Sequence, residues 1–310
     1  MAGPALCLVS AAGFGAMGIF GKLAYDSGVD TLTLLLVRFA VAGVIFWVVL
    51  AVRPALRPAR GIRAGLALGA VGYATQAGLF FAALHRMDAS LLELVLYSYP
   101  AWVALAAYAL GRERPTRARL VALGLSSTGL VVVLAAAAGG SFDPLGAAMG
   151  IGASLAYTTY ILVADRAGAQ MPALGLSALV CLGATATFAA VGLASGQVDT
   201  SFAASGWLWL ALIAVVSTVI PIVTFFAGLA RVGPSNAAIL STLEPVVTVV
   251  LAYLAFSERL SAVQLAGATL VLGAAVLLTS TRSGAGRPAG RPTLRLPMPS
   301  TRSPRPAERA

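Results

Sequence analysis

Three ionisable side chains lie deep inside long apolar stretches of this sequence. Glu244, Glu93 and Arg38 are each flanked by mostly apolar residues over several helical turns. A charged group at the centre of a membrane helix costs at least about 2.5–3.5 kcal/mol, so such groups usually face a cavity or a partner. These residues are therefore the first candidates for chemistry in the chain.

The surroundings of these groups suggest different roles. Glu244 shares a helical face with Ser241 and Thr248, and it can hold a substrate amine or a proton. Alternatively, it is a buried, protonated carboxyl group bonded to the backbone. Arg38 and Glu93 are expected to lie toward the same side of the molecule and to form a structural ion pair. Glu93 could instead line a cavity.

Two prolines interrupt corresponding apolar stretches. Pro100 and Pro245 are 145 residues apart, and each removes one helical hydrogen bond. Matched interruptions in two halves of a membrane protein indicate a transport site whose gating depends on the broken helices. The simpler alternative is that both prolines produce packing kinks.

Aromatic, amide and hydroxyl side chains recur on the same stretches as these groups. A mixed aromatic and polar wall suits an amphiphilic small molecule, although each residue could equally serve packing between helices. Together with Ser241 and Glu244, the candidates for substrate binding are Tyr73, Gln76, Phe80, Tyr97, Tyr99, Trp102, Tyr157, Tyr160 and Asn236. We expect Tyr99 and Trp102 to share one helical face.

The elements that position these residues are membrane-spanning helices. Hydrophobic residues make up 59% of the 310 residues and charged residues only 10%, which leaves too little polar surface for a water-soluble fold. Spans of roughly 20 apolar residues are predicted at 4–25, 31–52, 63–84, 89–110, 117–137, 145–164, 172–194, 206–230, 235–256 and 261–280. The sequence thus predicts an all-α integral membrane protein with ten transmembrane helices.

The distribution of charge predicts the topology. Most of the 21 Lys and Arg residues fall in loops on one side or in the tail, whereas the loops of the other side hold only Arg86 and Arg259. The positive-inside rule therefore places both termini in the cytoplasm, in a multi-pass protein of the cell membrane. The net charge of +10 then reflects topology and not nucleic-acid binding.

Lys22, near the outer end of its span, is expected to extend to water. The segment 281–310 is predicted to be a disordered basic tail.

An internal repeat organises the ten spans. With a shift of 145 residues, Phe80-Phe81 aligns with Phe225-Phe226, Pro100 with Pro245, and Glu113-Arg114 with Glu258-Arg259. The repeats are 1–140, which holds the first five helices, and 141–280, which holds the other five. Because five is odd, the second repeat is inverted relative to the first, an arrangement that lets two halves rock about a central site.

The same motifs resemble those of the EamA family of the drug/metabolite transporter superfamily. The resemblance covers nearly all of 4–280 and depends on the segments 97–100, 110–114, 240–245 and 257–260, and on Arg38-Phe39. It implies a ten-helix fold with a cavity lined by helices one, three, four, six, eight and nine. It also implies movement of small metabolites, often amino acids and often outward. Phe256 departs from the family pattern, which commonly has glycine there.

Other functional classes find less support in the sequence. The chain has one histidine, His85, so it lacks a His-Glu-x-x-His zinc site, and it has no nucleotide-binding loop. We therefore predict no catalytic residues, no metal and no cofactor. The partners that we expect are a small-molecule substrate and the lipid bilayer, with the protein as a monomer or homodimer. A membrane-embedded enzyme, a passive channel and a regulatory membrane subunit remain the alternatives to a secondary transporter.

Overall fold

The computed structural model describes residues 2–111, 116–137, 143–168, 171–232, 237 and 240–282, and this part of the chain is helical with no strand. The predicted tail beyond residue 282 lies outside it. In the first half the α-helices are α1 (Ala2–Gly15), α2 (Met17–Asp26), α3 (Thr31–Val52), α4 (Ile62–Ala67), α5 (Ala74–Leu84), α6 (Ala89–Leu96), α7 (Tyr99–Ala109) and α8 (Arg117–Ala137). The second half has α9 (Pro144–Gly168), α10 (Ala173–Ser195), α11 (Ala204–Ala214), α12 (Ile220–Val232), α14 (Glu244–Phe256) and α15 (Ala262–Arg282).

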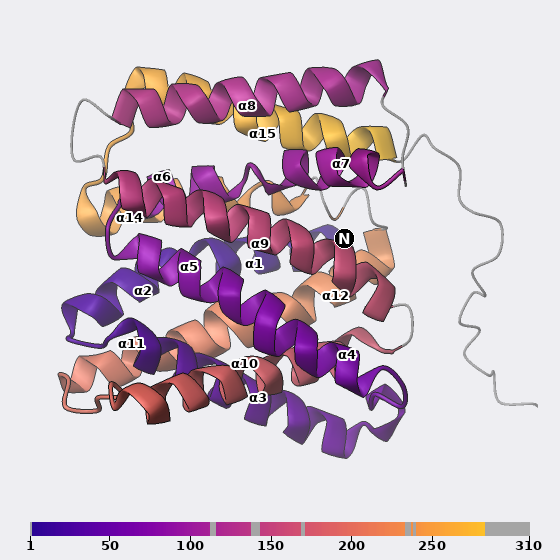
Figure 1. Cartoon of the computed structure of the whole chain (residues 1–310), viewed down its shortest axis with the longest axis vertical. Coiled ribbons are helices and arrows are strands. Elements are labelled where there is room, and N and C mark those ends of the chain that lie inside the picture. Colours follow the sequence, from indigo (N-terminus) through magenta and orange to yellow (C-terminus); the bar gives the residue numbers. More distant parts are fainter. Residues whose placement is uncertain are drawn as a thin grey trace, which may run out of the picture.

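Several of these helices join into longer rods. A π-helical turn, η2 (Leu68–Tyr73), connects α4 to α5, and a second one, η3 (Val215–Val219), connects α11 to α12. A short 3-10 turn, η1 (Pro54–Leu56), follows α3. The rods lie side by side, with α8 and α15 packed together at one end of the long axis and α3 and α10 near the other (Figure 1).

Eight of the rods are long and apolar enough to cross a membrane. They extend over Gly3–Asp26, Thr31–Val52, Ile62–Leu84, Ala89–Ala109, Leu120–Ala137, Pro144–Ala164, Ala173–Ser195 and Ala204–Leu229. These rods coincide with the first eight predicted spans, and two shorter apolar helices, Glu244–Phe256 and Ala262–Leu277, lie within the last two. Ten complete crossings therefore stay a prediction.

The outer surface of the bundle is apolar. Leu193 is 87% exposed and Leu254 is 70% exposed, whereas Arg38 and Glu93 are buried. This arrangement would be unfavourable in water, but lipid solvates apolar side chains. Because lipid offers no hydrogen-bond partners, the backbone N–H and C=O groups must pair with one another inside helices. The chain is therefore a multi-pass membrane protein.

Glycine permits the closest contact between two of the rods. A Cβ atom on Gly69 in η2 would overlap the carbonyl oxygen of Val180 in α10, and a Cβ atom on Gly183 would lie 2.7 Å from the backbone nitrogen of Ala70. The hydroxyl of Thr187 donates to the carbonyl of Ala70 at 2.7 Å. The π-helical turn is thus held against α10 by backbone contact, as is common where membrane helices pack through small residues.

We expect the substitution Gly69→Ala to destabilise this contact. The added methyl group must displace the backbone of α10, and overpacking of this kind costs about 1–3 kcal/mol. Thermal unfolding of the purified protein in detergent is the measurement. Gly78→Ala in the same rod is the matched control, because a Cβ atom at Gly78 meets nothing within 4 Å. Equal unfolding temperatures for the two variants would contradict the prediction.

Candidate functional site

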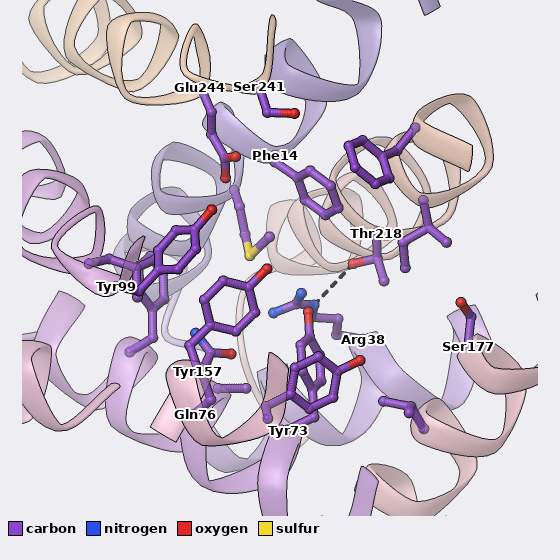
Figure 2. Close-up of a pocket in the computed structure, with 18 of the residues that line it drawn as sticks. Phe14, Arg38, Tyr73, Gln76, Tyr99, Tyr157, Ser177, Thr218, Ser241 and Glu244 are labelled. Carbon is purple, nitrogen blue, oxygen red and sulfur yellow. Dashed lines mark hydrogen bonds between the residues drawn. The ribbon is translucent and has the colours of Figure 1, made fainter. Parts of the chain in front are cut away.

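A cavity of about 300 Å³ lies among the helices, bordered by aromatic, polar and charged side chains (Figure 2). The structure brings together most of the candidate residues chosen from the sequence. Those that line the cavity are Arg38, Tyr73, Gln76, Phe80, Glu93, Tyr97, Tyr99, Tyr157, Tyr160, Ser241 and Glu244. Of the described lining residues, none belongs to α8 or α15.

The other candidates lie elsewhere. Trp102 is not among the residues that line this cavity, and its indole nitrogen donates to the hydroxyl of Ser98 at 3.1 Å. The expected common helical face of Tyr99 and Trp102 stays a prediction, and of the two residues only Tyr99 borders the cavity. Asn236 lies outside the described residues.

Sequence reasoning missed several lining residues. They come from the kink between α1 and α2 and from α10, η3 and α12, and they include Phe14, Met17, Ser177, Val180, Cys181, Thr218, Ile222, Phe225 and Phe226. The signal for Phe225-Phe226 was present in its repeat counterpart, Phe80-Phe81. Arg38 and the residues of α10 add the second and seventh spans to the set of helices that the resemblance implies.

Tyrosine rings form one continuous wall of the cavity. Ring centroids are 5.7 Å apart for Tyr97 and Tyr99, 4.8 Å for Tyr99 and Tyr157, 6.0 Å for Tyr157 and Tyr160, and 5.1 Å for Tyr160 and Tyr73. Such contacts restrict each ring and leave an aromatic surface that carries hydroxyl groups. This wall can contact a flat apolar group on one side and make hydrogen bonds at its edges.

The two prolines lie at breaks rather than in the cavity wall. Pro100 and Pro245 are each the second residue of a helix, α7 and α14. Proline cannot donate to the carbonyl four residues earlier, which frees the carbonyl groups of Leu96 and Ser241. The Ser154 hydroxyl donates to the first at 3.2 Å, and the Tyr97 hydroxyl donates to the second at 2.7 Å.

Glu244 takes part in the second of these breaks. The Tyr97 hydroxyl, besides its contact with the carbonyl of Ser241, lies 2.9 Å from Oε2 of Glu244. Thr248 donates to the carbonyl of Gly15 at 2.9 Å, which ties α14 to the end of α1. The carboxyl group of Glu244 thus borders the cavity (Figure 2), at the break that precedes α14.

The expected ion pair between Arg38 and Glu93 does not form. Arg38 instead donates from Nε to the hydroxyl of Thr218 at 3.0 Å, and its guanidinium carbon lies 4.9 Å from the ring centroid of Phe39. No ion pair involving Glu93 occurs within the described residues. The two side chains are on different spans whose positions around the cavity keep them apart, a separation that residue depth alone does not reveal.

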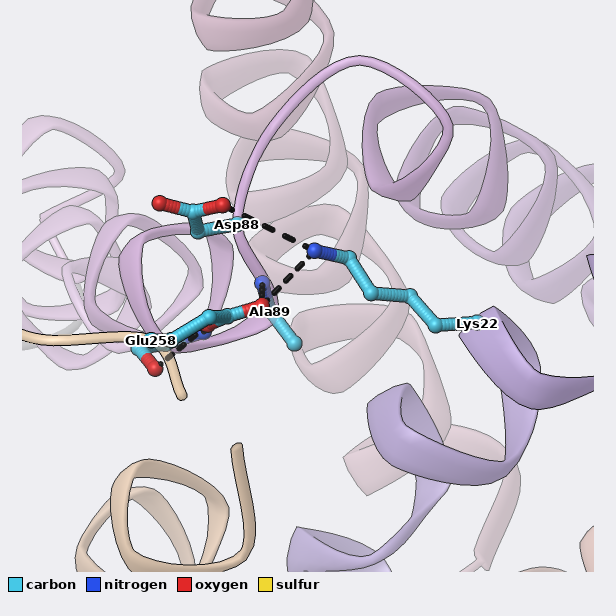
Figure 3. Close-up of polar contacts among 5 residues, drawn as sticks. Lys22, Asp88, Ala89 and Glu258 are labelled. Atoms are coloured by element: carbon cyan, nitrogen blue, oxygen red, sulfur yellow. Dashed lines mark hydrogen bonds and ion pairs between the residues drawn. The ribbon is translucent and has the colours of Figure 1, made fainter. Parts of the chain in front are cut away.

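A charged contact at one end of the bundle, which we call the latch, joins Lys22, Asp88, Ala89, Ser90 and Glu258 (Figure 3). Nζ of Lys22 lies 2.7 Å from Oε1 of Glu258 and 3.7 Å from Oδ1 of Asp88. The Ser90 hydroxyl donates to Oε2 of Glu258 at 2.7 Å. Lys22 is thus held by carboxylates and does not simply extend to water as predicted.

Glu258 also caps a helix. Its carboxylate accepts the backbone N–H of Ala89 at 3.2 Å and of Ser90 at 3.1 Å, at the N-terminus of α6. Ser257 has a left-handed φ of 57°, which costs a residue with a side chain about 1–2 kcal/mol and turns the chain after α14. Partial burial raises the pKa of Glu258, but the hydrogen bonds from Lys22 and Ser90 outweigh it, so the pKa lies below its usual value.

Comparison with known proteins agrees with this architecture. A model of the EamA-like transporter family matches residues 1–135 and 144–280. An uncharacterized transporter of Archaeoglobus fulgidus is 28% identical over 281 residues, which cover 89% of this chain and 95% of that protein. The uncharacterized transporter YcbK of Bacillus subtilis is 28% identical over 286 residues, 86% of this chain and 89% of its own. A crystal structure with 22% identity covers 90% of this chain and 99% of its own, with a TM-score of 0.61, so the fold is similar.

Proposed function

The chain belongs to the EamA-like transporter family, and on this premise we propose that it is a secondary transporter of a small amphiphilic metabolite. The substrate is an amino acid or a related compound, and it is exported across the cell membrane by alternating access. The observation that carries the proposal is the cavity of about 300 Å³, which has an aromatic wall and charged groups and is bordered by broken helices from both halves. Sites of this kind are typical of secondary transporters.

Matched irregularities support ten spans in two inverted repeats. The helix breaks at 97–98 and 242–243 are 145 residues apart, as are the prolines that follow them. The π-helical turns at 68–73 and 215–219 also lie at nearly corresponding positions. The family model matches the chain twice, once in each half. With five spans in each half, the second repeat has the opposite orientation in the membrane.

The position of the latch supports an inward-facing state. Lys22 and Glu258 join the first and ninth spans to the start of the fourth at one end of the bundle. The cavity extends from Glu93, four residues after the start of α6 at the latched end, to Ser177, which is four residues after the start of α10 and within about 6 Å of the opposite end. Under the positive-inside topology, the latched end faces outward and the cavity is loaded from the cytoplasm, as export requires.

The proposal is tested by transport into proteoliposomes that contain the purified protein. We expect uptake of at least one member of a panel of labelled amino acids and related amphiphiles, with saturation kinetics. Tyr157→Ala, in the cavity wall, should reduce uptake by about tenfold or more, because the substrate loses one aromatic contact and one hydrogen bond. Tyr108→Ala should transport normally, because Tyr108 is 53% exposed on the surface of the bundle.

Two results would contradict transport of this kind. The first is the absence of uptake for the whole panel by protein that unfolds cooperatively. The second is a single-channel conductance in planar bilayers, which would identify a passive channel in place of an alternating-access carrier.

A further inference from the structure

We propose that Arg38 and Glu93 are the two charged poles of the ligand site in the cavity, and that the ligand is a zwitterion with an apolar body. Its carboxylate binds the guanidinium of Arg38, and its ammonium group donates to the carboxyl of Glu93. The inference rests on the proposed transport function and adds to it the chemical polarity of the substrate and the residue that binds each end.

Arg38 carries a hydrogen-bond donor that the protein leaves unused. The residue is 1% exposed and borders the cavity, and its Nη2 atom has no hydrogen-bond partner. A guanidinium group is a donor only and stays charged, so the missing partner must be an acceptor. A buried, uncompensated charge is also costly. An anionic acceptor therefore supplies both the missing hydrogen bond and the compensating negative charge.

The orientation of the guanidinium is set by the groups around it. Nε donates to Oγ1 of Thr218, and the Thr218 hydroxyl itself donates to the carbonyl of Ile213 at 2.9 Å. The guanidinium carbon lies 4.9 Å from the ring centroid of Phe39 and 5.5 Å from that of Phe81. In Figure 2 the guanidinium group extends from Thr218 into the space bounded by Tyr157 and Tyr73. Its planar fork is thus positioned in advance for a carboxylate.

Glu93 carries a hydrogen-bond acceptor that the protein leaves unused. It is 4% exposed and borders the same cavity, and its Oε1 atom has no hydrogen-bond partner. An unpartnered carboxyl oxygen accepts a donor. An ammonium group offers up to three donors in a compact volume. One free donor on Arg38 and one free acceptor on Glu93 therefore define a site that a molecule with both a carboxylate and an ammonium group completes.

The rest of the cavity suits the remainder of such a molecule. The tyrosine wall and Phe80 provide a surface for an apolar side chain, and a volume of about 300 Å³ is at the small end of ligand pockets. An inorganic anion would satisfy Arg38 but would leave Glu93 and the aromatic wall without a partner. The arrangement therefore favours an amphiphilic amino acid over a free anion.

The test is competition for binding to the full-length protein in detergent. Labelled glycine, L-leucine and L-phenylalanine are the zwitterionic probes, and the best binder of the three is competed with its own amide and with its deaminated acid. For L-phenylalanine these competitors are L-phenylalaninamide, which lacks the carboxylate, and 3-phenylpropionate, which lacks the ammonium group. We expect each competitor to bind about tenfold or more weakly than the amino acid, as for loss of one charge-assisted hydrogen bond.

Variants assign the two poles separately. Arg38→Gln should abolish discrimination between the amino acid and its amide, while discrimination against the deaminated acid remains. Glu93→Gln should do the reverse. Arg38→Lys keeps the charge and should retain part of the preference for a carboxylate. If Arg38→Gln does not fold, the analogue series on the natural protein and the Glu93→Gln variant still decide the matter.

Several outcomes would overturn the inference. Among them are equal binding of the amino acid and its amide, binding of none of the three amino acids, and competition by chloride or phosphate that matches the amino acid. Transport of a compound without a carboxylate would refute this inference and leave the proposed function intact. Binding with the expected discrimination in a protein that transports nothing would refute the proposed function and leave this inference standing.

Discussion

Replacing Glu258 by alanine is expected to open the latched end of the bundle. The substitution removes the carboxylate that binds Lys22 at 2.7 Å and accepts three donors from Ala89 and Ser90. Hydrogen bonds to a charged group contribute about 1.5–3 kcal/mol, so the equilibrium between closed and open states should shift about tenfold to a hundredfold toward opening.

Access to the native thiol in the cavity measures this shift. Cys181 borders the cavity, whereas Cys7 is buried elsewhere and is replaced by alanine in a background variant. A membrane-impermeant thiol reagent added outside intact cells should modify Cys181 about tenfold faster in Glu258→Ala than in the background. Unchanged modification rates would show that the latch does not control this end.

A second ion pair serves as the matched control. Arg86 and Asp143 lie 3.0 Å apart, but their side chains are 43% and 29% exposed. Exposed pairs contribute about 0–1 kcal/mol, so Arg86→Ala, which breaks this pair and leaves the Asp143 cap of α9 in place, should change the modification rate of Cys181 little. A large effect of this control would indicate general loosening and not the release of a latch.

The latch also has a predictable dependence on pH. Its hydrogen bonds hold the pKa of Glu258 below its usual value of 4.5, so the latched state favours the ionised carboxylate. The contribution of this group to stability is therefore fully present above pH 4.5 and is lost as pH falls through the lowered pKa. We expect the modification rate of Cys181 at a fixed thiolate concentration to stay constant near neutral pH and to rise only under acidic conditions.

Replacing Glu244 by glutamine is expected to abolish proton-driven accumulation while substrate exchange continues. Glutamine has nearly the same shape and can still form a hydrogen bond with the Tyr97 hydroxyl, which contacts Glu244 at 2.9 Å, but it cannot release a proton. If one proton moves with each substrate, a gradient of one pH unit supports about tenfold accumulation. In the variant, the substrate should only equilibrate.

Proteoliposomes with an imposed pH gradient provide the measurement. Tyr97→Phe is the matched variant, because it removes the hydroxyl that contacts Glu244 and leaves the carboxyl group in place. It should change the apparent affinity and keep the response to the gradient. If Glu244→Gln accumulates substrate as the natural protein does, this carboxyl group has no part in proton coupling.

The amino-acid sequence by itself determined that this is a membrane protein and where most of its spans lie. This was possible because burial in lipid demands about 20 apolar residues in a row, a signal that is local. It also brought Tyr73, Gln76 and Glu244 into one set of candidates that border the cavity, because polar groups at helical depth must be directed inward. The resemblance to the EamA family is confirmed for the same reason, since its motifs are short and contiguous.

Only the tertiary structure decided which of these groups meet. Arg38 bonds to Thr218, 180 residues away, and Lys22 to Glu258, 236 residues away. Trp102 turned out to face Ser98. Such pairings depend on the rotation and offset of whole helices, and each break or π-helical turn resets the direction of the side chains beyond it. Periodicity within one span does not carry that information, so the latch and the unpartnered Nη2 atom of Arg38 became visible only once the helices were packed together.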